Sequence, residues 1–244
     1  MTDPFSALEE LSQRPNQRVV MRQSWRNLLF LHVAVEPELV QNLLPKGLTV
    51  ETYDGKAWIG FVIFQMQNIR FAGTPAIPGF SSFPETNVRT YVVDKNGIPG
   101  VWFFSLDASN LTACLFARRA FNLNYIWAKM ALRHQHGTFQ ASGIRKHHPE
   151  IGYQASWQIA GDPAPAARES FDYWLVERYL LFAEKDGKLF SGRVHHPPYQ
   201  IRDVQNLSIQ QNLIPIPGYE TTEIWDHITF SPGVDVEVFG LKKS

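Results

Sequence analysis

Residues 85–91, with the sequence ETNVRTY, carry an acid, an amide, a guanidinium and a phenol at alternating positions. Alternate side chains of a β-strand share a face and lie about 7 Å apart. We therefore predict that Glu85, Asn87, Arg89 and Tyr91 point to one side. A solvated outer face would show the same pattern. A cavity face is favoured because the segment follows a loop rich in Pro and Gly, and because short, mostly β-branched residues alternate with the polar ones.

Such a face could bind and protonate a small acid. An arginine binds a carboxylate or enolate oxygen in a fork geometry, and a glutamate can act as a general base. On the next predicted strand, Ser105 and Asp107 share a side, and Ser105 could contact the same ligand. Asp107 precedes a predicted helix, where an acid is typically a cap. His32 stands alone in an apolar strand, as a core histidine or a pocket histidine.

Several kinds of site are not expected. The histidines lie in adjacent or alternating pairs, and no Cys or carboxylate completes a metal-ligand set at the usual spacing. No dinucleotide, phosphate-loop, nucleophile-elbow or zinc-protease motif is present. The single cysteine, Cys114, lies on an apolar helix face and is interpreted as a small buried hydrophobe. We therefore predict neither a metal nor a cofactor.

Composition limits the partners. Basic and acidic residues number 23 each, so no net charge attracts nucleic acid. No run approaches the ~18 apolar residues of a membrane helix, and the acidic N-terminus lacks the apolar core of a secretory signal. The sequence predicts a cytoplasmic protein whose partner is a small molecule. An N-terminal arm at residues 1–20 is expected to pack on the surface or on a second subunit, which would make a homo-oligomer.

The elements that must position these residues are mostly strands. Residues 25–35 form a near-continuous apolar run, typical of a buried strand. Turn signals at Asp54-Gly55, Asn96-Gly97, His136-Gly137 and Asp186-Gly187 predict hairpins. Helices are predicted near residues 4–13, 37–45 and 108–121. About a dozen antiparallel strands in one domain must curl or close. We predict one β-barrel domain at residues 21–244.

Long ordered strings identify a family. WRNLLFLH, LLPKGL, DGKAWIGFVIFQM, FPETNVRTYV and ARRAFNLNY resemble the YqjF-like family of uncharacterised bacterial proteins over residues 25–238. That family is similar to acetoacetate decarboxylases. The resemblance implies a mainly β fold, a closed antiparallel β-barrel with a few short peripheral helices. It also implies a central site with a Schiff-base lysine, a second lysine that lowers its pKa, and a glutamate.

The resemblance places the glutamate at Glu85 but removes both lysines. Arg118 matches the arginine of the lysine motif, Asn122 and Asn124 replace a Gly and the Pro, and Tyr125-Ile126 stand where the lysines would be. A phenol cannot form an imine. Lys129 lies about 13 Å further along an extended strand. The chain is therefore not expected to be an acetoacetate decarboxylase.

Two functional hypotheses remain, with a third from assembly. In the first, Glu85 is a general base and Tyr125 a hydrogen-bond donor or general acid in lyase- or isomerase-like chemistry on a small oxo acid. Its predicted binding residues are Arg89, Asn87, Ser105, His32 and Arg118. The second is a non-catalytic protein that binds an apolar or carboxylated metabolite. The third is an assembly module that uses the N-terminal arm and aromatic residues near Trp174 and Tyr179, which are expected to be exposed.

Overall fold

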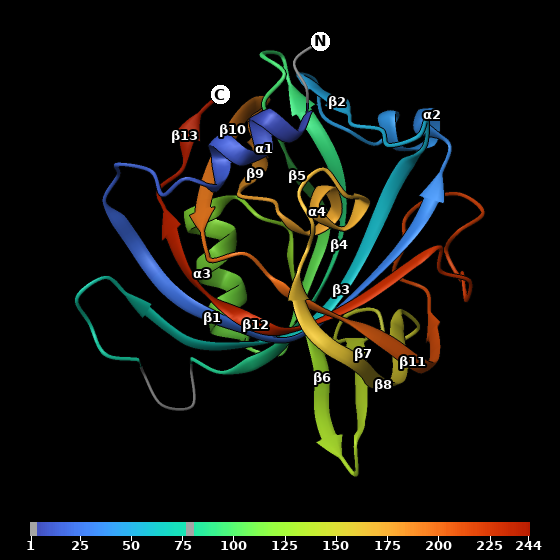
Figure 1. The fold of residues 1–244 in the computed structure, drawn as a ribbon. Helices are drawn as coiled ribbons and strands as arrows, with labels where there is room; N and C mark the ends of the chain where they lie inside the picture. Colours follow the sequence, from blue (N-terminus) through green and yellow to red (C-terminus); the bar gives the residue numbers. More distant parts are fainter. Residues whose placement is uncertain (1–3, 77–80) are drawn as a thin grey trace.

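The computed structural model describes residues 4–76 and 81–244, and β-strands dominate it (Figure 1). The helices are α1 Pro4–Ser12, α2 Pro37–Gln41, α3 Leu111–Phe121 and α4 Phe171–Val176. The strands are β1 Val19–Val35, β2 Leu48–Val50, β3 Ala57–Phe71, β4 Phe83–Asp94, β5 Pro99–Ala108, β6 Tyr125–Gln135, β7 Thr138–Arg145, β8 Gly152–Pro165, β9 Leu180–Lys185, β10 Lys188–His195, β11 Gln200–Gln211, β12 His227–Phe239 and β13 Lys242–Lys243. The prediction of a mainly β fold is confirmed.

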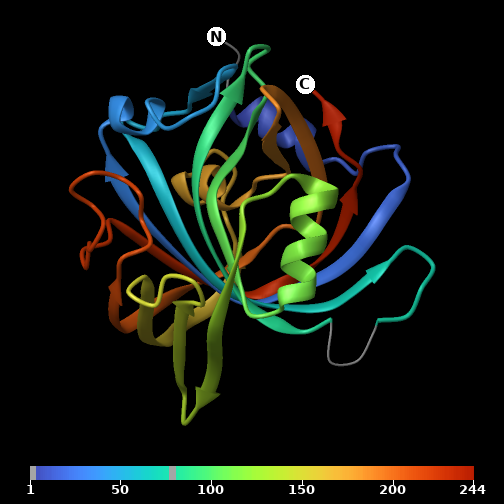
Figure 2. The ribbon, with the colours of Figure 1, turned by 180° about the vertical axis from the view of Figure 1, so that it is seen from behind.

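All these strands belong to one hydrogen-bonded sheet, in the order β13-β10-β9-β5-β6-β7-β8-β11-β12-β1-β3-β4-β2. Two further pairings, β10 with β12 and β4 with β5, join strands that are distant in that order. Hydrogen-bonded neighbours can consequently be followed from β4 through β3, β1, β12, β10, β9 and β5 back to β4. The sheet is strongly curved in both views (Figures 1 and 2).

The expectation of purely antiparallel pairing is wrong at two places. Strand β5 runs parallel to β6 and parallel to β9. The first parallel pair arises because α3 carries the chain back to the other end of the sheet between β5 and β6, as a crossover connection must. This crossover places the first residue of β6, Tyr125, beside Leu106 of β5.

Residues that adopt a left-handed backbone form the turns of two predicted hairpins. His136 and Gly137 (φ 49° and 76°) join β6 to β7, and Asp186 and Gly187 (φ 51° and 73°) join β9 to β10. Both pairs have the left-handed backbone that a two-residue hairpin turn needs. The Asp54-Gly55 turn is also present, but the strand before it, β2, pairs with β4 and not with β3.

Helix α3 begins and ends at asparagines. The side chain of Asn110 accepts a hydrogen bond from the Ala113 backbone N–H, and Asn122 ends the helix in the left-handed region (φ 52°). The expectation that Asp107 caps this helix is therefore wrong. Seen from behind, α3 lies in front of the curved sheet (Figure 2). Of the helices in the described ranges, none combines the length and hydropathy that a membrane crossing requires.

The N-terminal arm packs against this chain's own sheet. Leu8 of α1 is fully buried, and Arg193 of β10 donates hydrogen bonds of 2.8 Å to the backbone oxygens of Leu11 and Gln13. Arg14 forms an ion pair of 2.6 Å with Glu237 of β12. The segment from α1 to β1 is thus held by both β10 and β12.

Candidate functional site

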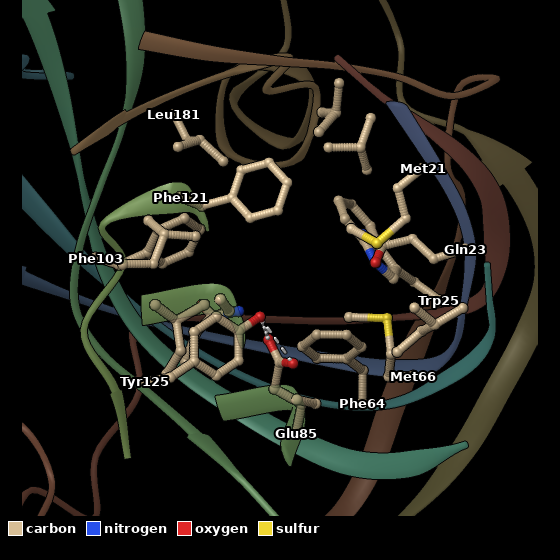
Figure 3. A pocket seen from close by; sticks show the side chains of 18 of the residues that line it. Met21, Gln23, Trp25, Phe64, Met66, Glu85, Phe103, Phe121, Tyr125 and Leu181 are labelled. Carbon is tan, nitrogen blue, oxygen red and sulfur yellow. Dashed lines mark hydrogen bonds between the residues drawn. The ribbon is translucent and has the colours of Figure 1, made fainter. Parts of the chain in front are cut away.

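A cavity of about 300 Å³ is lined by residues of the curved sheet and of α3 (Figure 3). Strands β1, β3, β4, β5 and β9 and helix α3 all contribute to its wall. Most of the lining is apolar, including Trp25, Phe64, Met66, Phe103, Phe121 and Leu181. Polar side chains are few, so each one matters for what the cavity can bind.

Glu85 and Tyr125 lie next to each other in the cavity lining, with their oxygen atoms directed toward one another (Figure 3). The phenol of Tyr125 donates to Glu85, with oxygen–oxygen distances of 3.2 Å to Oε2 and 3.3 Å to Oε1. Glu85 is 1% exposed. Burial raises the pKa of Glu85 to about 8, against a smaller lowering by the hydrogen bond from Tyr125. Burial also raises the pKa of Tyr125 well above its usual range. Both groups are therefore protonated at neutral pH.

Asn87 and Arg89 follow Glu85 on the same face of β4, and all three line the cavity as their spacing predicts. Asn87 is buried, and its side-chain oxygen has no hydrogen-bond partner among the described residues. A buried polar atom without a partner costs stability. Asn87 Oδ1 is therefore an acceptor available to a ligand.

Arg89 is a buried cation that forms no ion pair with any described residue. Its Nη2 donates to the backbone oxygen of Leu175 at 3.3 Å and to the Tyr91 hydroxyl at 3.4 Å. Its guanidinium also lies 5.7 Å from the ring centroid of Phe30. Across residues 4–76 and 81–244, no carboxylate lies within ion-pair distance of Arg89, and its Nε has no partner. Buried charges are normally paired, so this one is suited to a ligand's anion.

A second buried arginine, Arg178, also lines the cavity and was not predicted from the sequence. It forms a 2.6 Å ion pair with the buried Glu51, and its Nε donates to the backbone oxygen of Trp174. Its Nη2 has no partner among the described residues. Nothing in its sequence neighbourhood distinguishes it.

The expectation that Trp174 and Tyr179 are exposed is wrong, since each is only 1% exposed.

Ser105 does not line the cavity, because β5 has a bulge. The register places Val88 opposite Ser105 and Arg89 opposite Phe103, so Phe104 is the extra residue. The bulge puts Phe103 and Leu106 in the lining and turns Ser105 away. There Ser105 accepts a hydrogen bond of 2.9 Å from Arg145, which also forms a 2.7 Å ion pair with Asp107. Ser105 and Asp107 therefore anchor β7 against β5.

His32 and Arg118 are likewise not among the described residues that line the cavity. The fully buried His32 lies 2.8 Å from the Tyr91 hydroxyl, behind Arg89, and burial lowers the pKa of His32 well below its usual range. Arg118 is exposed, and its Nε donates to the backbone oxygen of Tyr125 at 2.6 Å. His32 supports the arginine, and Arg118 fixes the corner that presents the phenol.

The described lining contains no lysine. Lys129 is exposed on β6. Cys114 is buried near Glu85, and burial raises the pKa of its thiol to about 11, which leaves little thiolate at neutral pH. Among the described residues no cluster of His, Cys, Asp and Glu could hold a metal ion. The acid, the phenol, the amide and the two arginines of the lining can transfer protons, form hydrogen bonds and bind an anion.

Comparisons with known proteins agree with this architecture. Residues 22–235 match a family described as an uncharacterised conserved protein, DUF2071. The uncharacterised protein YqjF of Bacillus subtilis is 38% identical over 186 residues, which is 76% of this chain and 76% of that protein.

Among solved structures, an acetoacetate decarboxylase from Legionella pneumophila has a TM-score of 0.68 at 14% identity, covering 98% of this chain and 95% of the other. The enduracididine biosynthesis enzyme MppR complexed with pyruvate has a TM-score of 0.64 at 13% identity, covering 95% and 92%. At such identities the likeness shows an acetoacetate decarboxylase-like fold and nothing about activity.

Proposed function

The chain belongs to the DUF2071 family of uncharacterised conserved proteins, and we propose that it binds a small oxo or carboxylic acid in the cavity and transfers protons to it through Glu85. The observation that carries this proposal is the pairing of two unusual groups in one apolar cavity. Arg89 is a buried cation without a carboxylate partner in the described structure, and Glu85 is a buried acid that stays protonated at neutral pH.

The binding step follows from charge. The ligand's carboxylate would lie against Arg89, with Arg178 adding a second guanidinium whose own charge is offset by Glu51. Asn87 would accept a hydrogen bond from a hydroxyl or enol of the ligand. Hydrogen bonds between an arginine and a carboxylate are charge-assisted and roughly twice as strong as neutral ones. The apolar surroundings of the arginines reduce screening by water.

The chemical step follows from protonation. The sequence predicts a general base at Glu85, but the raised pKa makes it a proton donor at neutral pH. Glu85 would give its proton to the oxo oxygen, and the carboxylate so formed would accept a proton from the adjacent carbon. The net change is a keto–enol isomerisation without gain or loss of protons. Tyr125 would stabilise the transient Glu85 carboxylate through its hydrogen bond. Lyase-like reactions that pass through an enol would use the same groups.

We also propose that the strands close around the cavity as a barrel within one domain at residues 21–244. The circuit of paired strands from β4 back to β4 supports closure. Closure would exclude water from the acid and the arginine. A homo-oligomeric state and a cytoplasmic location stay predictions from the sequence.

A non-catalytic binding protein is the second candidate. The largely apolar lining, which contains no lysine or reactive thiol in the described residues, favours it. Proton exchange separates the two candidates. The enzyme should exchange the hydrogen next to the oxo group of a bound acid for solvent deuterium, as followed by NMR. Glu85→Gln should abolish this exchange and still bind the acid. Binding without exchange in the wild type would instead establish the second candidate.

A binding experiment tests the premise that both candidates share. Oxo acids and matched neutral amides would be screened for their effect on the melting temperature, since a ligand that binds only the folded state raises it. We expect acids to raise the melting temperature and amides to have no effect. If no acid stabilised the wild type, the catalytic candidate would be wrong, and so would a binding protein for a carboxylated metabolite.

A further inference from the structure

The entrance to the cavity is formed by exposed residues, whereas the acid, the amide and the two arginines of the lining are buried. Every exposed residue that lines the cavity, within the described ranges, belongs either to residues 71–75, which begin at the last residue of β3, or to residues 112–116 of α3. The opening therefore lies between these two segments. Phe71 and Phe116, 50% and 39% exposed, meet across it with ring centroids 5.5 Å apart.

The inner groups have the opposite character. Glu85, Asn87, Arg89 and Arg178 are each less than 10% exposed. Between them and the entrance the wall is formed by rings and aliphatic side chains, such as Met21, Phe64, Met66 and Phe121. An apolar wall thus runs from the buried charged groups to the exposed rings of Phe71 and Phe116, beside which Arg70, Thr74 and Thr112 also line the cavity.

We propose that the acid is an amphipathic, straight-chain one, with its carboxylate at Arg89 and its alkyl chain extending between α3 and residues 69–75 to the entrance. This inference rests on the proposed function and specifies its substrate class. A short acid such as pyruvate would fill the inner end and leave the apolar wall bare. An alkyl chain would cover that wall, and its end would contact Phe71 and Phe116. Exposed aromatic residues at an opening are then part of the binding surface.

The proposal predicts how affinity depends on chain length. Each methylene removed from water contributes about 0.8 kcal/mol, which corresponds to about fourfold in Kd. Affinity should therefore rise by about this factor for every methylene added to the acid. The gain should level off once the chain extends past Phe71 and Phe116 into water.

The experiment is a calorimetric titration of the purified full chain with pyruvate, 2-oxohexanoate and 2-oxodecanoate. Ala117→Trp narrows the entrance from α3. Thr112→Trp also narrows it, from an exposed position where the larger side chain does not disturb core packing. Both should reduce the ratio of long-acid to short-acid affinity at least tenfold. Ala120→Trp is the matched control, because Ala120 lies on the same helix, is exposed and does not line the cavity. It should keep the wild-type ratio.

The outcomes separate this inference from the function on which it rests. Binding of all three acids with no gain from added methylenes would overturn the inference and leave the proposed function standing. The absence of binding by any acid would overturn both. The reverse orientation would place the carboxylate on Arg70 at the entrance. Loss of long-acid binding in Arg70→Met, with binding retained in Arg89→Met, would overturn the inference in favour of that orientation.

Discussion

The phenol oxygen of Tyr125 lies 3.2 Å from Oε2 of Glu85, although the two residues belong to strands that do not pair with each other. Strand β5 lies between them, with Ala108 opposite Glu85 and Leu106 opposite Tyr125. The contact therefore depends on the parallel pairing of β5 with β6 that α3 makes possible. The hydrogen-bond partner of the buried Glu85 carboxyl is therefore a neutral phenol and not a cation.

The stability of the protein should depend on pH through Glu85. Its pKa is about 8 in the folded chain and near the ordinary 4.5 when unfolded. The folded state thus holds the proton more tightly, so this contribution is complete below about pH 4.5 and is lost as pH rises towards 8. Between these limits the wild type should lose about 1.4 kcal/mol per pH unit relative to Glu85→Gln.

Urea unfolding of both proteins at several pH values measures this difference. Glu177 is also buried, and burial raises its pKa, but it is present in both proteins, so its contribution cancels in the difference. A constant difference between the wild type and Glu85→Gln across the range would show that Glu85 ionises normally.

Tyr125→Phe should raise the pKa of Glu85 further. The hydrogen bond from the phenol lowers that pKa, so its removal leaves burial less opposed. The carboxyl C=O stretch in infrared difference spectra reports the titration directly. We expect the midpoint to move upward and the free energy of unfolding to fall by about 1 kcal/mol, as for one lost hydrogen bond. A downward shift would mean that water replaces the phenol as a better donor.

The two buried arginines should respond differently to replacement. Arg178→Met leaves Glu51 buried without its partner, and removal of one member of a buried ion pair costs about 3–5 kcal/mol. Arg89→Met strands no carboxylate in the described structure, so its cost should stay within about 1 kcal/mol. Yet Arg89→Met should abolish the melting-temperature shift produced by oxo acids. Equal destabilisation by both variants would show that Arg89 has a structural partner.

Acetoacetate with borohydride should leave no covalent adduct on the protein. The described cavity lining contains no lysine, and Lys129 is exposed on β6. Intact-mass spectrometry after reduction checks this, with a lysine-dependent decarboxylase as the positive control. A stable adduct mapped to any lysine would contradict the absence of Schiff-base chemistry.

Local signals in the sequence were enough for many of the strands and for several of the turns. The alternation in residues 85–91 correctly placed Glu85, Asn87 and Arg89 on one face, because a strand's side-chain period is fixed. The turns at His136-Gly137 and Asp186-Gly187 also follow from residues that tolerate left-handed backbone. Their functional roles stay predictions.

Features that depend on distant contacts could not be predicted in the same way. The bulge at Phe104 moved Ser105 out of the cavity, and no residue near it marks an extra position. Arg178 enters the site because α4 and β9 bring it to Glu51, which is 127 residues away. Asp107 resembles a helix cap in sequence, but Arg145 from β7 is its partner instead. Each of these features is set by tertiary packing.

Helix α3 bounds the entrance through Phe116 and ends at the left-handed Asn122, three residues before Tyr125. Helix α3 thus connects the cavity entrance to the segment that carries Tyr125. A change that tilts α3 to admit a bulkier ligand would also displace the Tyr125 hydroxyl, which donates a hydrogen bond to Glu85. Under the proposed function, selectivity for ligand size and the pKa of Glu85 are therefore coupled, and a substitution at either end of α3 should be assessed for both.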